Sequence, residues 1–342
     1  MNVKMWIKAL QVIPRMSREE WQELDVISKW MVAVRSAVLL MTFISAAIAG
    51  LLALLASKRG IVALPENAFW RWLLLVGGLV FAHAANNLIN DWTDSARGVD
   101  QDNYFRTQYG PQPIQQGLWS KREVISYIAI TGLIAVAAGL PLLLWNGWPA
   151  VILMAVGAIF VLFYTWPLKY IGLGEVAVIV IWGPLMIGGG YYVITGSWNW
   201  QQDWLVLLAS LPFALGATTV LFGKHIDKLD LDKAKRIYTL PVILGEKAAR
   251  VTAVVMMALM YLTVIVLVIL GYFSPVLLTV FLALYTMQRV IPIYRLPKPA
   301  NRPDNYDDSI WPLWFSAAAF YHNRSFGLIF LLALMVQVFF LS

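Results

Sequence analysis

The sequence predicts an all-α, polytopic membrane protein with about nine transmembrane helices around a central cavity that opens to the cytoplasmic side. Of its 342 residues, 60% are hydrophobic and only 13% are charged. A soluble domain carries nearly twice that charged fraction, so lipid must be the solvent for most of this chain. The apolar runs are also long, and about 20 apolar residues in a helix cross about 30 Å of hydrocarbon.

Nine apolar segments are expected to cross the membrane, with boundaries that hydropathy places to within a few residues. The eighth of them is short. A further apolar stretch, residues 311–320, holds two tryptophans and is expected at the membrane interface, where Trp is enriched. The nine predicted spans are residues 30–56, 69–89, 124–145, 150–163, 176–194, 204–222, 248–270, 275–287 and 326–341.

Positive charge is distributed unevenly between the two sides that these spans define. All but four of the 26 lysines and arginines lie in the N-terminal segment or in loops on its side of the membrane. Lys and Arg concentrate in cytoplasmic loops, so the N-terminus and these loops are expected in the cytoplasm. The same rule explains the net charge of +7 without a nucleic-acid partner. Because the loops on this side are long and polar, the functional site is expected there.

The chain contains no cysteine. A disulfide framework, a thiolate metal site and a cysteine nucleophile are therefore excluded.

A first acidic cluster closes the second predicted span. Asn87, Asp91 and Asp94 are spaced i, i+4 and i+7, so on a helix they share one face and form a column of oxygen ligands. Asn90 precedes Asp91, and Asp100 follows after a glycine that lets the chain turn back. Carboxylates at the end of a span are costly unless paired or bound, which makes this column a candidate ligand site.

A second acidic cluster closes the sixth predicted span on the same side. Asp227, Asp230 and Asp232 follow Lys224, and the first two of these acids are expected one helical turn apart. A single acid here would most often be a solvated helix cap, but two clusters on one face favour a shared cavity. Oxygen ligands of this kind suit Mg²⁺, which keeps several waters and bridges to phosphate oxygens. The pattern therefore predicts a site for Mg²⁺ and a diphosphate.

Other polar residues near these clusters are candidates with more than one interpretation. Lys169 is the only cation in its loop, which favours phosphate binding, whereas Arg106 suits a phosphate contact and an orienting charge equally well. Glu175 fits a helix cap as well as it fits catalysis. His83 and His225 fit either a cavity wall or a hydrogen bond to a neighbouring helix.

These motifs resemble those of the UbiA superfamily of intramembrane prenyltransferases. The string Asn87-x-x-Asn90-Asp91-x-x-Asp94 is similar to that family's first aspartate motif. The second cluster, followed by Thr239-Leu240-Pro241-Val242, is similar to the second motif, and the segment from Tyr164 to Glu175 matches as well. The resemblance covers roughly residues 30–290 and implies a transmembrane prenyltransferase domain there. An amphipathic cytoplasmic segment, residues 1–29, precedes it, and residues 291–342 add an interfacial loop and the last helix.

Within the family, the sequence looks most like the branch that prenylates 1,4-dihydroxy-2-naphthoate for menaquinone. Asp100 behind the first motif, the pair Gly110-Pro111 and the string Gln115-x-Gly117 carry that similarity. The second motif departs from the family pattern, since Lys224 stands where that motif often has Asn. Other acceptors of the family remain alternatives: 4-hydroxybenzoate, homogentisate, chlorophyllide or a lipid alcohol. A cation-coupled membrane transporter is the alternative of another class, and it predicts acids at mid-span.

The resemblance implies Mg²⁺ as cofactor, and a polyprenyl diphosphate, an aromatic acceptor and the lipid bilayer as partners, with neither nucleic acid nor an obligate protein partner. The catalytic residues it implies are Asp91, Asp94, Asp227 and Lys169. The metal ligands it implies are Asp91, Asp94 and Asp100 for one ion and two or more of Asp227, Asp230 and Asp232 for another. Asn87, Asn90, Arg106, Gln115, Tyr164, Lys169 and Lys224 are expected to bind the diphosphate and the acceptor.

Overall fold

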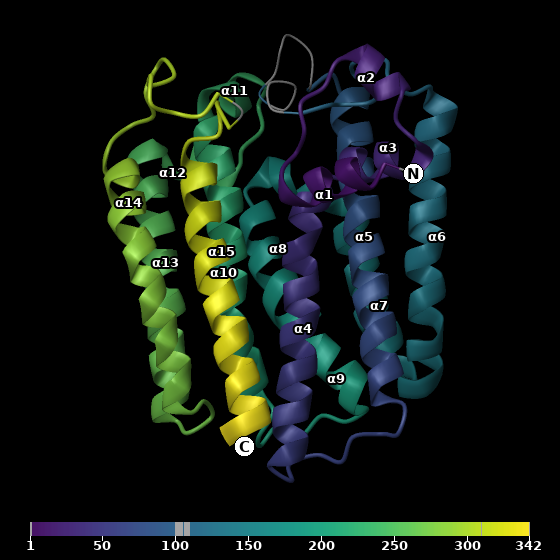
Figure 1. Ribbon diagram of the computed structural model, residues 1–342, viewed down its shortest axis with the longest axis vertical. Coiled ribbons are helices and arrows are strands. Elements are labelled where there is room, and N and C mark those ends of the chain that lie inside the picture. Colours follow the sequence, from purple (N-terminus) through teal and green to yellow (C-terminus); the bar gives the residue numbers. More distant parts are fainter. Residues whose placement is uncertain (1, 100–104, 106–109, 309, 342) are drawn as a thin grey trace.

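The computed structural model describes residues 2–99, 105, 110–308 and 310–341, and every regular element in this part of the chain is a helix. The long helices run side by side as a bundle, and the chain begins near one end of it and finishes at the other (Figure 1). In chain order the elements are α1 (Val3–Gln11), α2 (Arg18–Gln22), α3 (Val26–Ala33), α4 (Ser36–Lys58), α5 (Ala68–Ala96), α6 (Lys121–Asn146), α7 (Trp148–Phe163), η2 (Leu168–Ile171), α8 (Gly174–Val180), η3 (Ile181–Gly188), α9 (Gly189–Thr195), α10 (Trp204–Asp227), α11 (Leu229–Ala234), α12 (Leu240–Leu244), α13 (Glu246–Ile269), η4 (Pro275–Ala283), α14 (Leu284–Arg295), α15 (Phe315–Val336) and η5 (Gln337–Leu341).

The described helices identify an integral, multi-pass membrane protein. Eight of them, counting α8–α9, η4–α14 and α15–η5 as continuous units, are long and apolar enough to cross a membrane, and α7 is a shorter apolar helix of 16 residues. Many of their large apolar side chains face outward, as lipid contact requires. The predicted fold class is confirmed, whereas the count of nine crossings stays a prediction.

The first predicted span is not one continuous helix. Residues 30–56 were expected to form a single span, but α3 ends at Ala33 and α4 begins at Ser36. Arg35 between them adopts a left-handed backbone with φ of 58°, which breaks the helix. Its side chain turns into the bundle and contacts α5, so the break aims a cation at the first acidic cluster.

The last helix also begins earlier than predicted. The span expected at residues 326–341 is part of a longer helix, because α15 starts at Phe315, which is fully buried, and the interfacial position expected for residues 311–320 stays a prediction. Two contacts with α10 fix this start. The carboxylate of Asp227 accepts backbone N–H groups from the first turn of α15, and Gly223 lets the two helices approach closely. A Cβ at Gly223 would lie 2.7 Å from the backbone of Phe315, closer than packing allows.

Helices α5 and α10 carry the two acidic clusters to the same end of the bundle, which we call the motif end. α5 finishes there at Ala96, and α10 finishes there at Asp227. The short helices α2 and α11 lie at this end (top of Figure 1). The predicted column of Asn87, Asp91 and Asp94 thus lies on one continuous helix. Asp227 and Asp230 do not share a helix turn, because Lys228 breaks the helix between α10 and α11.

Candidate active site

A cavity of about 1160 Å³ lies inside the bundle, walled by α4–α7, η3, α9, α10 and α15. Its lining is mainly apolar along the spans, with residues such as Leu74, Leu142 and Val193 in the half distant from the motif end. At the motif end the lining becomes polar and includes Asp91 and Asp94. This gradient suits an amphiphile with a charged head and a long apolar body.

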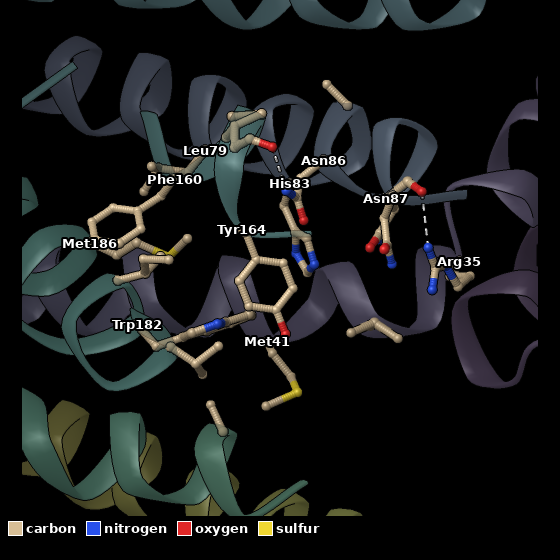
Figure 2. A pocket seen from close by; sticks show the side chains of 18 of the residues that line it. Arg35, Met41, Leu79, His83, Asn86, Asn87, Phe160, Tyr164, Trp182 and Met186 are labelled. Carbon is tan, nitrogen blue, oxygen red and sulfur yellow. Dashed lines mark hydrogen bonds between the residues drawn. The ribbon is translucent and has the colours of Figure 1, made fainter. Parts of the chain in front are cut away.

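The first acidic cluster forms the polar wall on α5. Asp91 accepts a hydrogen bond from Nη2 of Arg35 at 3.1 Å, and both groups are buried. The same Nη2 atom donates to the carbonyl oxygen of Asn87 at 3.0 Å (Figure 2). Asn87 in turn donates from Nδ2 to the carbonyl of Val34 at 2.8 Å. These bonds clamp the start of α4 to α5 and fix the orientation of the carboxylate.

Lys169, on the short helix η2, contacts this wall. Its ammonium group lies 2.9 and 3.0 Å from the two carboxylate oxygens of Asp94, and the residue is only 5% exposed. The loop before η2 is tied to α5, because the hydroxyl of Thr165 donates to Oδ1 of Asn90 at 3.0 Å. The loop in which Lys169 is the only cation therefore reaches the first cluster, as the sequence analysis expected. Two contacts with α5 hold it there, one from Thr165 and one from Lys169 itself.

Three aromatic groups lie close together in the cavity beside its polar end. His83, Tyr164 and Trp182 come from α5, the end of α7 and η3 (Figure 2). The rings of His83 and Trp182 meet edge to face, with centroids 5.4 Å apart, and Nδ1 of His83 lies 2.7 Å from the hydroxyl oxygen of Thr42. Burial raises the pKa of Tyr164 well above its ordinary value of 10, so its hydroxyl keeps its proton at neutral pH.

The second acidic cluster is arranged differently from the prediction. Both oxygens of Asp227 accept backbone N–H groups, from Trp314, Phe315 and Ser316 at 2.9 to 3.0 Å, and Asp227 does not line the cavity. Asp230 is exposed on α11. Asp232 is fully buried and accepts a hydrogen bond from Nζ of Lys228 at 2.8 Å.

Helix α10 instead presents basic groups to the cavity. Lys224, His225 and Lys228 all line it. Nδ1 of His225 lies 2.5 Å from Oε1 of Glu175, and the other carboxylate oxygen of Glu175 accepts the backbone N–H of Leu240 at 3.3 Å. Glu175 therefore fastens α8, α10 and α12 together, as a buried structural contact does.

The cavity lining is strongly biased toward positive charge. Asp91 and Asp94 are the acidic side chains among the described lining residues. The basic lining residues outnumber them, and they are Lys8, Arg15, Arg35, Lys169, Lys224, Lys228 and Arg324. Cationic groups in a cavity with apolar walls favour an anionic ligand, so the lining that the structure describes suits an anionic head group.

The donor set at the first cluster fits Mg²⁺. Among the described residues, no three His, Asp or Glu side chains come close enough to form a complete metal site by themselves. Mg²⁺ does not need such a cage, because it is commonly held by one or two carboxylates together with water and substrate phosphates. Asp91 and Asp94, less than one helical turn apart and facing the cavity, provide those carboxylates. The second cluster offers no comparable pair, because Asp227 points into the N-terminus of α15.

The structure brings together most, but not all, of the predicted site residues. Gln115 is exposed, and its Oε1 accepts a hydrogen bond from the hydroxyl of Ser95 at 3.4 Å. Asp100 and Arg106 lie outside the described residues. Asp227, Asp230 and Asp232 are absent from the cavity lining. The predicted residues that do line the cavity are Asn87, Asn90, Asp91, Asp94, Tyr164, Lys169 and Lys224.

Two cations of the site were missed by the sequence analysis. Arg35 carries the only charge inside the first predicted span, and a charge at such a position signals a function or a buried partner. Lys228 follows Lys224 by four residues, which places both on one face of a helix. Either pattern in the sequence could have identified its residue as a candidate for the site.

Fold and site define a class: an integral membrane protein with an internal cavity that is apolar along the helices and polar at the motif end. The sequence model of the UbiA prenyltransferase family matches residues 39–313, and the chain belongs to this family of prenyltransferases. A 1,4-dihydroxy-2-naphthoate octaprenyltransferase of Bacillus subtilis is 24% identical over 274 residues, which span 78% of this chain and 82% of the relative.

Solved structures of UbiA homologues have the same fold. The apo structure of a homologue from Aeropyrum pernix aligns with a TM-score of 0.59 at 18% identity, over 86% of this chain and 97% of that one. A homologue from Archaeoglobus fulgidus bound to DMAPP and Mg²⁺ aligns with a TM-score of 0.52 at 15% identity, over 88% of this chain and 99% of that one.

Proposed function

We propose that this protein transfers a polyprenyl group from a polyprenyl diphosphate to 1,4-dihydroxy-2-naphthoate, with Mg²⁺ at the first acidic cluster. The observation that carries the proposal is the cavity of about 1160 Å³, whose lining is apolar along the helices and rich in cations at the motif end. A polyprenyl diphosphate has that same polarity. The family, the naphthoate relative and the homologue bound to DMAPP and Mg²⁺ support the assignment.

In this proposal, the polar part of the cavity at the motif end binds the diphosphate. Asp91 and Asp94 are the residues that would hold Mg²⁺, which supplies neutralisation of the charge on a leaving diphosphate. Lys169 and Arg35 stand beside these two carboxylates at 2.9 and 3.1 Å, close enough to contact phosphate oxygens at the same place. Because both cations are already fixed by ion pairs, little reorganisation is needed as charge develops.

The reaction is an electrophilic substitution on an electron-rich ring. The bond between C1 of the prenyl group and the diphosphate oxygen breaks, and its electron pair leaves with the diphosphate. The allylic cation accepts an electron pair from a ring carbon of the acceptor, and the ring carboxylate is then lost as CO₂. Tyr164 and Trp182 line the cavity and offer π faces that can stabilise such a cation.

The acidic groups also weigh against a cation transporter. A transporter predicts acids near mid-span, whereas Asp91 and Asp94 lie within the last two turns of α5. The same end carries the basic loops, so we propose that the motif end and the N-terminus are cytoplasmic. The limits of the catalytic domain, residues 30–290, and of its flanking segments 1–29 and 291–342, stay predictions.

The test is prenyl transfer by the purified protein with geranylgeranyl diphosphate, Mg²⁺ and a panel of acceptors. The panel holds 1,4-dihydroxy-2-naphthoate, 4-hydroxybenzoate, homogentisate, a chlorophyllide and a lipid alcohol. Asp91→Asn is the inactive variant, and Asp230→Asn, which changes an exposed acid, is its matched control. Product with the naphthoate that Asp91→Asn abolishes supports the proposal. Product with another acceptor alone would assign the protein to a different branch of the family. Absence of product with every acceptor, from folded protein, would reject the proposed function.

A further inference from the structure

We propose that residues 8–15 form the acceptor side of the active site, and that the ammonium group of Lys8 selects acceptors that carry a carboxylate. The assignment rests on the proposed function and deepens it, because it names the part of the cavity that receives the aromatic substrate. These residues lie before the predicted catalytic domain, residues 30–290, so the active site would extend into the N-terminal segment.

Helix α1 lies beside the point where Arg35 enters the bundle. It packs against both α3 and α4, the two helices that Arg35 separates (Figure 1). Ala9 of α1 is 1% exposed and belongs to the buried cluster that also contains Val34 and Leu88, the chain neighbours of Arg35 and Asn87. Helix α1 is therefore held close to the polar wall of the cavity.

The link from α1 to α2 is fixed by contacts with segments that are distant in the chain. Ile13 packs against a buried cluster that contains Val99 and Ile237, which follow the two acidic motifs. Arg15 donates a hydrogen bond from Nη2 to the carbonyl oxygen of Trp311, in the loop before α15. The link therefore touches the segments after both motifs and the start of the last helix.

The same segment forms part of the cavity wall. Pro14 is buried and Ile13 is half-buried, whereas Lys8 and Gln11 are exposed. This part of the wall thus combines apolar surface with polar side chains at the solvent-exposed margin of the cavity. The lining residues that the segment contributes are Lys8, Gln11, Val12, Ile13, Pro14 and Arg15.

The two substrates together need three kinds of lining. The prenyl tail matches the apolar residues along the spans, and the proposed function assigns the diphosphate to the first acidic cluster with Lys169 and Arg35. The acceptor ring has to reach C1 of the prenyl group without displacing the tail or the diphosphate. It therefore needs a further wall beside the first cluster, and residues 8–15 meet that requirement because α1 lies beside Arg35.

The side chains of this segment match the chemistry of an aromatic acid. A flat ring packs on apolar side chains such as Val12 and Pro14, and a carboxylate forms a charge-assisted hydrogen bond with an ammonium group such as that of Lys8. The amide group of Gln11 can pair with a ring hydroxyl. The naphthoate of the proposed function has a fused ring, a carboxylate and two hydroxyls. Lys8 is therefore expected to act on acceptor binding and selectivity.

The experiment measures equilibrium binding of two small aromatic probes to the full-length protein in lipid nanodiscs, with empty nanodiscs as background. The probes are 1-hydroxy-2-naphthoate and 1-naphthol, which lacks the carboxylate. The donor site is filled with Mg²⁺ and geranylgeranyl thiolodiphosphate, a donor analogue that does not ionise readily. The variants are Lys8→Gln, Lys8→Glu and the control Lys4→Gln, which changes an exposed lysine of α1 that does not line the cavity.

We expect wild type and Lys4→Gln to bind 1-hydroxy-2-naphthoate about three- to tenfold more tightly than 1-naphthol. Lys8→Gln should lose this preference, because the carboxylate no longer meets a cation there. Lys8→Glu should reverse the preference, because like charges repel. Affinity for the thiolodiphosphate should be the same in all four proteins.

The inference would be overturned by a wild type without preference for the carboxylate probe, or by a Lys8→Gln protein that keeps the preference. A Lys8→Gln protein that keeps it but binds the thiolodiphosphate more weakly would assign Lys8 to the donor, which also overturns the inference. Because binding does not depend on turnover, the proposed function fails separately. A preference that depends on Lys8, in a protein that transfers no prenyl group to any acceptor, would support the acid-binding site and reject the proposed function.

Discussion

The ammonium group of Lys169 lies almost equally far from the two carboxylate oxygens of Asp94, at 2.9 and 3.0 Å, in a buried position. The two residues are 75 positions apart in the chain, so the contact joins the loop after α7 to the end of α5. It places a fixed positive charge beside the carboxylate that is proposed to hold Mg²⁺. A diphosphate and the Mg²⁺ bound to it can therefore be held at the same place in the cavity under this proposal.

Replacing Lys169 should slow prenyl transfer. We expect Lys169→Gln to lower kcat about 100-fold, because it removes a preorganised positive charge from the position where the diphosphate leaves. Steady-state kinetics measure the effect, with Lys247→Gln, an exposed lysine of α13, as the control. In the double variant Lys169→Gln/Asp94→Asn the buried pair is neutral, and full recovery of activity there would show that Lys169 only balances a charge.

The contact of Asp227 with α15 should matter for stability more than for metal affinity. We expect Asp227→Ala to lower the free energy of unfolding by about 1–3 kcal/mol, because three backbone N–H groups, two of them in buried contacts, lose their acceptor. Equilibrium unfolding in mixed detergent micelles measures this loss, and the exposed Asp230→Ala should change it by less than about 0.5 kcal/mol. An Asp227→Ala protein as stable as wild type, with a raised Mg²⁺ requirement, would contradict the structural assignment.

Arg35 and Asp91 should act as a unit. Arg35→Gln and Asp91→Asn each remove one charge of a buried ion pair, whereas the double variant removes both. We expect their effects on stability to be non-additive by about 1–3 kcal/mol in a double-mutant cycle. Additive effects within about 0.5 kcal/mol would show that the two groups do not interact in the folded protein.

The apolar part of the cavity should set which prenyl chains fit. Gly157 on α7 lines the cavity, and a Cβ there would meet nothing within 4 Å. We expect Gly157→Leu to lower kcat/KM for geranylgeranyl diphosphate relative to geranyl diphosphate about tenfold, since the new side chain occupies space that a long tail needs.

The matched control for Gly157 is Gly77 on α5, which has equal room for a Cβ but does not line the cavity. Gly77→Leu should leave the ratio of the two donors unchanged. Equal ratios in wild type, Gly157→Leu and Gly77→Leu would mean that the tail does not pass Gly157.

The first cluster could be predicted because it depends only on helix periodicity. The spacing of Asn87, Asp91 and Asp94 places them on one face of any helix, and α5 continues far enough to include all three. Lys169 could be predicted because no other cation competes with it in its loop. In both cases the local sequence contained the deciding information.

The second cluster could not be predicted in the same way, because its orientation depends on distant parts of the chain. Asp227 faces the N–H groups of residues 314–316, about 90 positions later, and no local pattern reveals that partner. The helix also breaks at Lys228, so the expected turn between Asp227 and Asp230 does not form. The start of α15 and the orientation of Arg35 depend on tertiary contacts of the same kind.

Product analysis by mass spectrometry tests the central claim most directly. The wild-type protein, in lipid nanodiscs with Mg²⁺, receives geranylgeranyl diphosphate and 1,4-dihydroxy-2-naphthoate. We predict a prenylated 1,4-dihydroxynaphthalene product whose mass shows one geranylgeranyl group gained and CO₂ lost, absent with Asp91→Asn. Unchanged substrates in the presence of folded wild-type protein that binds geranylgeranyl diphosphate would contradict the claim that this cavity performs the transfer.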